Sequence, residues 1–114
     1  MKDEEGILMS HDFLMARIYL REDDKVEGKL AYRRLLELLK EWGISGATVL
    51  KSIIGYGTTK SFHYEGIEVL SYSLPVVIEF VDEEKKVMKV LETLSSRGFS
   101  FFITLERVSL WHSS

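Results

Sequence analysis

The chain has 114 residues, with 15 lysines and arginines, 18 aspartates and glutamates and a formal net charge of −3. This length fits one domain that buries about two-thirds of its unfolded surface, and it is too short for two domains. Because the chain has no cysteine, it has no disulfide, thiolate zinc site or thiol nucleophile, and its acidic balance argues against a large DNA-binding surface.

Residues 1–12 are mostly polar apart from Ile7, Leu8 and Met9, and we expect them to form a flexible arm before a single domain at residues 13–114. The acidic start is unlike a secretory or mitochondrial leader, and no apolar run reaches the roughly 18 to 20 residues of a membrane span. We therefore expect a cytoplasmic protein without membrane insertion. The absence of Asn and Gln, with a single Pro, matches thermophilic compositions.

Apolar residues alternate from Leu14 to Leu20, which predicts a half-buried strand that ends in the acidic segment 22–25. A 3.6-residue repeat then predicts an amphipathic helix from Ala31 to Trp42, ended by Gly43. A segment rich in Val, Ile and Leu predicts a second strand at residues 47–54.

Residues 55–73 contain many Gly, Ser and Thr residues without a period, which predicts a long loop that is poorly ordered without ligand. A third strand is expected at residues 74–81, and Asp82 is the expected N-cap of a second helix that ends at Gly98. The buried stripe of this helix is expected to be Val87, Val90, Leu91 and Leu94. The fourth strand is expected from Phe99 to about Val108, with Phe99, Phe101, Ile103 and Leu105 facing inward.

This order predicts an α+β, ferredoxin-like βαββαβ domain, in which two helices cover one face of a four-stranded antiparallel sheet. A weak internal repeat supports this fold, because an alignment of Gly43 with Gly98 also aligns Leu35 with Val90. The expected residues of the uncovered face are Phe13, Met15, Tyr19 and Phe102, beside Arg17 and Arg21. So much aromatic surface predicts burial between identical subunits. The alternative is ordinary partial exposure together with a cover made by Leu110 and Trp111.

Motifs of the common enzyme classes are missing. The histidines, His11, His63 and His112, are scattered without metal-ligand spacing, and Asp23-Asp24 and Asp82-Glu83-Glu84 read as a turn and a helix start. No nucleophile elbow, complete Walker loop, full Rossmann fingerprint or RNA-recognition signature occurs. We therefore expect a binding protein that is not an enzyme, needs no cofactor and binds no nucleic acid.

One motif remains, Gly55-Tyr56-Gly57-Thr58-Thr59-Lys60, at the point where the second strand enters the long loop. Glycines let a backbone approach phosphate groups closely, and the lysine offers a mobile cation. In the alternative interpretation the two glycines only turn the chain and Lys60 is a solvated charge.

This segment resembles the Gly-Phe-Gly-x-x-Lys sequence with which PII signalling proteins enter their long effector loop. Together with the runs 46–50 and 70–82 and with His63, it resembles more closely an uncharacterised PII-like family of prokaryotes, over most of residues 13–109. The resemblance implies a homotrimer that binds an adenine nucleotide (ATP, ADP or AMP) as effector in clefts between subunits. The implied nucleotide-binding residues are Gly55, Tyr56, Gly57, Thr58, Lys60, His63 and Arg107.

The resemblance also implies that the long loop signals to an unidentified protein partner, with a membrane transport protein as one candidate class. Two features depart from PII proteins: Ser95-Ser96-Arg97-Gly98 stands where they carry a second glycine-rich loop, and Arg107 stands for their paired basic residues, with His112 as a substitute. Two alternatives are a divalent-metal-binding trimer similar to the CutA proteins and a small hydrolase of acyl or phosphoryl groups.

Overall fold

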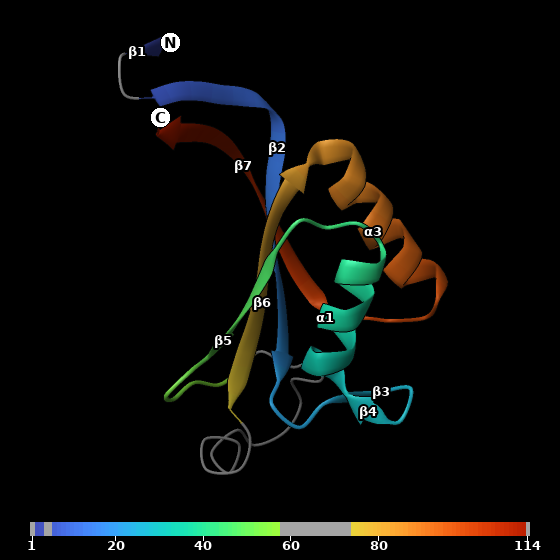
Figure 1. The fold of residues 1–114 in the computed structure, drawn as a ribbon. Coiled ribbons are helices and arrows are strands. Elements are labelled where there is room, and N and C mark those ends of the chain that lie inside the picture. The colour runs from blue at the N-terminus through green and yellow to red at the C-terminus, as the bar shows by residue number, and fades with distance from the viewer. Residues whose placement is uncertain (1, 4–5, 58–73, 114) are drawn as a thin grey trace.

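The computed structural model describes residues 2–3, 6–57 and 74–113 of the chain. The main sheet has the order β5-β6-β2-β7, and every neighbouring pair is antiparallel (Figure 1). Its strands are β2 (Gly6–Arg21), β5 (Ala47–Lys51), β6 (Pro75–Glu83) and β7 (Phe102–Ser113). Helices α1 (Ala31–Glu41) and α3 (Glu84–Ser96) cover one face of this sheet. The chain therefore has the predicted ferredoxin-like fold.

Three very short strands complete the described secondary structure. β1 (Lys2–Asp3) pairs with the start of β2, while β3 (Lys25–Val26) and β4 (Lys29–Leu30) form a small hairpin before α1. Among the described residues, no helix has the length and apolar content that crossing a bilayer requires.

The alternation predicted for the first strand is confirmed in β2, which lies at the centre of the sheet. Leu14, Ala16, Ile18 and Leu20 are all buried beneath the helices. β6 matches this pattern, since Val76 pairs with Leu20 and Ile78 pairs with Ile18 in the antiparallel register. Residues directly opposite each other in a sheet share a face, so these side chains form one apolar surface.

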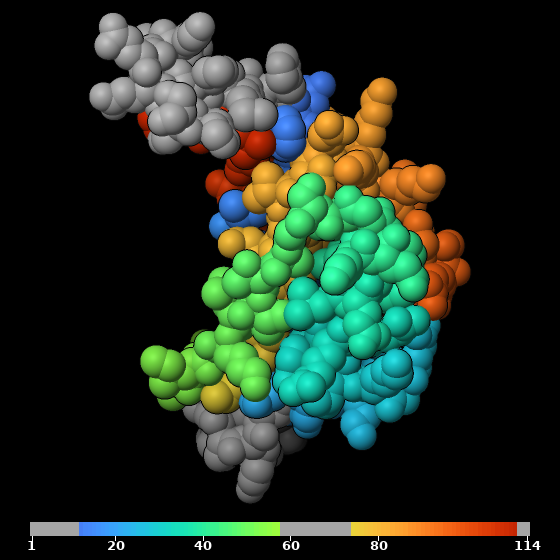
Figure 2. Space-filling model, viewed as in Figure 1, coloured from blue at the N-terminus to red at the C-terminus, as the bar shows by residue number. Residues whose placement is uncertain are grey.

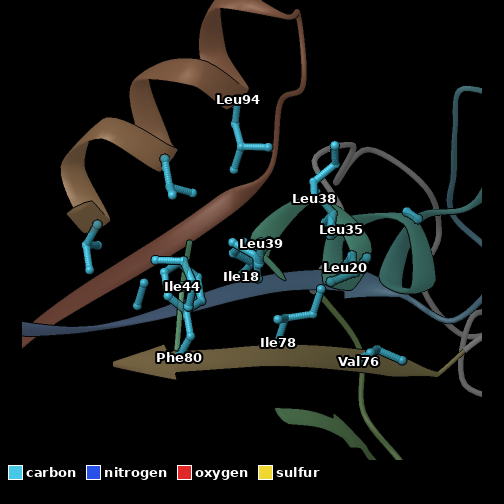
Figure 3. Packing of buried hydrophobic residues seen from close by; sticks show 14 of the residues in the cluster. Ile18, Leu20, Leu35, Leu38, Leu39, Ile44, Val76, Ile78, Phe80 and Leu94 are labelled. Atoms are coloured by element: carbon cyan, nitrogen blue, oxygen red, sulfur yellow. The ribbon is translucent and has the colours of Figure 1, made fainter. Parts of the chain in front are cut away.

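The helices supply the other half of the core (Figure 3). The buried residues of the two helices are Ala31, Leu35, Leu38 and Leu39 of α1 and Val87, Val90 and Leu94 of α3. Burying one such aliphatic side chain contributes about 1.5 to 3 kcal/mol. Each helix ends two residues before a glycine with positive φ, Gly43 at 89° and Gly98 at 83°, in agreement with the predicted internal repeat.

The ends of the first and last strands differ from the sequence prediction. β2 begins at Gly6 instead of near Phe13, because Gly6 to Met9 pair with Ser113 to Leu110 of β7. The two strands form a ribbon that curves away from the main sheet (Figure 1). β7 begins at Phe102, three residues late, since the Phe99 N–H donates to the Leu94 carbonyl and so closes the end of α3.

Two further expectations need correction. β5 ends at Lys51, and Ile53, which was expected inside the strand, is 94% exposed. Leu105 faces the helical side, opposite Ala16, but it is 44% exposed. β7 is an edge strand, and the two helices leave this part of it uncovered.

Asp82 is not the N-cap of α3, a position that Glu83 takes without a side-chain capping bond. The Asp82 carboxylate, 5% exposed, instead accepts the Ser45 N–H at 3.0 Å, the Ser45 hydroxyl at 3.1 Å and the Glu83 N–H at 2.8 Å. Burial by itself would raise the pKa of Asp82, but these donors together with Lys86 lower it below the ordinary value. The ionised carboxylate therefore ties the segment before β5 to the end of β6.

We predict that Asp82→Asn destabilises the protein by about 1 to 3 kcal/mol, because a buried acceptor of several N–H and O–H donors loses its charge. Since folding lowers the pKa of Asp82, its contribution is present above about pH 4 and is lost as the pH falls further. Urea unfolding of both proteins from pH 7 to pH 3 measures this. Glu92→Gln, on an exposed position of α3, is the control, and an equal loss in the two variants at pH 7 would contradict the role of Asp82.

Candidate functional site

The sheet face opposite the helices carries the apolar residues expected there. Phe13, Met15 and Tyr19 of β2 are partly buried on this face, and Phe102 of β7, which pairs with Tyr19, is 57% exposed. The Tyr19 and Phe102 rings contact each other, with centroids 5.5 Å apart and planes tilted by 53°. In the protomer, this aromatic surface has no covering layer among the described residues.

One row of charges crosses the same face. Arg17 lies between Glu79 of β6, at 3.1 Å, and Glu106 of β7, also at 3.1 Å, and these carboxylates raise its pKa, Glu106 most strongly. The Thr104 hydroxyl, opposite Arg17 in the register, is buried without a hydrogen-bond partner in the described part of the chain. The face thus carries apolar residues on both sides of a polar row.

Leu110 and Trp111 do not fold over this surface, so the expected cover by these two residues is wrong. Both residues continue β7, where they pair with Met9 and Leu8 in the projecting ribbon. The aromatic face therefore stays uncovered by the C-terminal segment.

The base of the long loop is held together through Pro75. The Ser52 N–H and hydroxyl donate to the Pro75 carbonyl at 3.1 and 2.7 Å, and the Glu22 N–H donates to the Leu74 carbonyl at 2.9 Å. Beyond Ser52 the chain projects from the body of the protein (Figure 2), and the Tyr56 side chain is 74% exposed. The first predicted binding residues thus stand at an exposed position above a fixed base.

Gly55 and Gly57 each have a structural reason to be glycine. A Cβ on Gly55 would lie 2.9 Å from the Pro75 Cγ, closer than side chains approach one another, whereas Gly57 has open space but a φ of 83°. Positive φ disfavours residues with a Cβ. Because the two glycines have no side chains, their backbone also stays accessible. The packing of Gly55 on Pro75 is therefore compatible with close approach of a ligand to this backbone.

The side chains beside the loop base were not predicted from the sequence. Lys51, the last residue of β5, lies 3.2 Å from Glu22 and 5.3 Å from the centroid of the Tyr32 ring. Arg33 lowers the pKa of Tyr32 most strongly, and Lys51 adds to this effect. No local pattern indicates this cluster, because its members come from β5, α1 and the turn after β2.

Arg107 lies far from the glycines within one protomer. It is opposite Leu14 in the register, whereas Pro75, which contacts Gly55, is opposite Arg21. Seven residues of strand separate these levels, a distance of about 23 Å. Arg107 pairs instead with Glu84 at 3.1 Å and lies 3.9 Å from Asp12. A single protomer therefore does not bring Arg107 and the loop base together.

The remaining predicted binding residues, Thr58, Lys60 and His63, lie outside the described residues, as does the predicted disorder of the loop. The side chains of His11 and His112 are outside them as well. In the described part of the chain, no group of three His, Cys, Asp or Glu side chains has a geometry that could hold a metal ion.

The connection between α3 and β7, where PII proteins carry a glycine-rich loop, is occupied by a paired arginine. Arg97 donates to Glu27 at 2.7 Å, and its guanidinium lies 5.6 Å from the Trp42 ring centroid and 5.5 Å from that of Phe99. Glu27 also accepts from Arg34 at 2.8 Å, and these arginines, Arg34 first, lower its pKa. Arg97 therefore joins the β3–β4 hairpin to the end of α3.

Comparisons with known proteins identify relatives of this chain. The family model described as DUF190, "Uncharacterized ACR, COG1993", matches residues 13–110. A UPF0166 protein of Aquifex aeolicus is 44% identical over 96 residues, which cover 84% of this chain and 90% of the relative. A UPF0166 protein of Methanocaldococcus jannaschii is 50% identical over 78 residues, which cover 68% of this chain and 71% of the relative.

A solved structure resembles the fold at lower sequence identity. The crystal structure of a putative PII-like signaling protein from Thermus thermophilus superposes with a TM-score of 0.54 and 16% sequence identity. The match covers 94% of this chain and 91% of that chain. At this identity the likeness is one of fold.

We predict that Gly55→Ala lowers the free energy of unfolding by about 1 to 3 kcal/mol, because the added methyl group overpacks against Pro75. Gly46→Ala is the matched control, since a Cβ there meets open space and its φ is not positive. Thermal and urea unfolding of the two variants measure the difference. Equal stabilities would show that the Gly55–Pro75 contact does not restrict the loop base.

Proposed function

The chain belongs to the DUF190 family, and we propose that it is a PII-like regulatory module, a homotrimer that binds an adenine nucleotide in clefts between its subunits. The long loop after β5 is the segment that reports ligand binding to a partner protein, for which a membrane transport protein is a candidate. The observation that carries this proposal is the uncovered aromatic face of the sheet.

The uncovered face supports assembly through its apolar residues. Phe13 and Met15 lie on one side of the Arg17 charge row, and Tyr19 and Phe102 lie on the other. Monomeric proteins rarely leave so much apolar surface in contact with water. A closed trimer would bury this face three times in equivalent contacts.

Assembly also explains why the proposed binding residues lie in two separate places on one subunit. The exposed glycine backbone of the loop base and Arg107 lie at opposite ends of one protomer's sheet. We infer that the loop base of one subunit adjoins Arg107 of a neighbour. The glycines admit the phosphates, the exposed Tyr56 ring offers a stacking surface, and Lys60 and Arg107 balance the phosphate charge.

We predict that Phe102→Glu converts the trimer to monomers, because a charge in an apolar interface has no partner there. Leu105→Glu is the matched control, since Leu105 is on the same strand but on the helical side, opposite Ala16. Light scattering at micromolar concentration gives the assembly state, and circular dichroism verifies that each variant is folded. Monomeric wild-type protein, or equal dissociation of both variants, would contradict the assembly.

We predict that calorimetry detects ATP, ADP or AMP binding to the wild type, and that Lys60→Ala weakens this binding by about 1 to 3 kcal/mol, the value of a charge-assisted hydrogen bond. Lys25→Ala, on an exposed lysine of β3, is the control. Divalent metal ions and a model acyl phosphate in the same series test the CutA-like and hydrolase alternatives. No nucleotide binding at millimolar concentration would exclude the proposed ligand.

Mixed trimers test whether the site is shared between subunits. Lys60→Ala and Arg107→Ala subunits are each defective, but co-refolding them creates some clefts with Lys60 from one subunit and Arg107 from the next. Recovery of tight binding in the mixture supports the shared site. Binding no tighter than that of either variant alone contradicts it.

A further inference from the structure

A groove on the helical side of the protein is separate from every residue of the proposed nucleotide site. It has a volume of about 370 Å³ and is lined by Trp42, Lys86, Lys89, Val90 and Thr93. This volume lies at the lower end of the range for small-molecule sites, which are mostly apolar with a few well-placed polar groups. The helices lie opposite the uncovered sheet face, so burial of that face in an assembly would not in itself close the groove (Figure 1).

The walls of the groove are held by contacts within the protomer. Val90 is 3% exposed and belongs to the core beneath α3, and Trp42 packs against that core from the end of α1. The Lys86 ammonium donates to the Gly43 carbonyl at 3.2 Å, which ties α3 to the segment that follows Trp42. Contacts within the chain therefore connect the two sides of the groove.

The charge of the groove differs from that of the whole chain. Although the chain has a net charge of −3, the two charged side chains that line the groove are both lysines. Lys86 lies 3.9 Å from the Asp82 carboxylate, which balances part of its charge, while Lys89 has no ion pair in the described part of the protein. The nearby Arg97 is already paired with Glu27. Lys89 thus contributes a positive charge without an ion pair to a groove that Trp42 also lines.

We propose that this groove binds a small aromatic anion, with its ring packed against Trp42 and its carboxylate or phosphate group held by Lys89 and Lys86. An indole ring gains contact with a planar ligand at little entropic cost, and an ammonium group recognises either kind of anion. The site is independent of the nucleotide site at the loop base, from which it differs in elements and in residues.

Phenyl phosphate is the probe, because it joins a ring and a charge at the size of the groove. Inorganic phosphate supplies the charge alone and phenol supplies the ring alone. Trp111→Phe is introduced first, so that Trp42 is the single tryptophan and its fluorescence reports the groove. We expect saturable change of Trp42 emission with phenyl phosphate at lower concentration than with either fragment.

Substitutions on α3 identify which lysine contributes to phenyl phosphate binding. Lys89→Gln is expected to weaken phenyl phosphate binding about fivefold, the effect of one partly solvated ion pair. Lys85→Gln removes the same charge from an exposed position of the same helix that does not line the groove, and it should leave binding within about twofold of the parent, as expected for a screened charge. Lys60→Ala should leave this binding unchanged, which separates the groove from the proposed nucleotide site.

Three results would overturn the proposal. The first is unchanged Trp42 emission up to tens of millimolar phenyl phosphate, a range that includes weak fragment binding. The second is an equal response to inorganic phosphate, which would show a charged surface without ring recognition. The third is equal weakening by Lys85→Gln and Lys89→Gln, which would show attraction to the whole helix. Amide shifts of Val90 and Thr93 in an NMR titration give an independent location for the probe.

Discussion

The pairing of β2 with β6 on one side and β7 on the other sets which face of the main sheet each residue of these three strands occupies. A shift of one residue in either register would exchange the buried face with the uncovered face. Ile18 lies between Ile78 and Ile103 on the helical side, and Arg17 lies between Glu79 and Glu106 on the other side. The ion pairs across the uncovered face thus agree with the same register that builds the core.

Local periodicity was sufficient to predict the fold class and the faces of β2, α1 and α3, because their buried residues recur at fixed spacing. It was insufficient where a contact joins distant parts of the chain. The start of β2 depends on a partner strand at the C-terminal end of the chain, and the role of Asp82 depends on Ser45, 37 positions earlier. Arg97 is likewise paired with a residue 70 positions away, Glu27, which no sequence pattern indicates.

The candidate site was only partly predictable for the same reason. The glycines of the loop base lie after the end of β5, as the sequence motif predicted. The spacing of the motif does not tell whether these positions are glycine because of packing on Pro75 or because a ligand approaches the backbone. Arg107 was predicted as a binding residue only from the resemblance to PII proteins. The strand register places it at the opposite end of the sheet from the glycines. The proposed cleft between subunits would depend on an assembly, and the sequence pattern of a single chain contains no direct record of an assembly.

The contacts at Leu74 and Pro75 have a consequence for how such proteins can diverge. The Ser52–Pro75 hydrogen bonds join the two chain segments that flank the long loop, and the bond from the Glu22 N–H to the Leu74 carbonyl ties the second segment to the end of β2. The sheet is therefore closed at the point where the loop leaves it. The entropy of closing a longer loop rises only with the logarithm of its length. Insertions, deletions and complete replacement between residues 57 and 74 should therefore change the folding stability of the domain little. The loop sequence can then diverge among relatives while the sheet and helices stay the same.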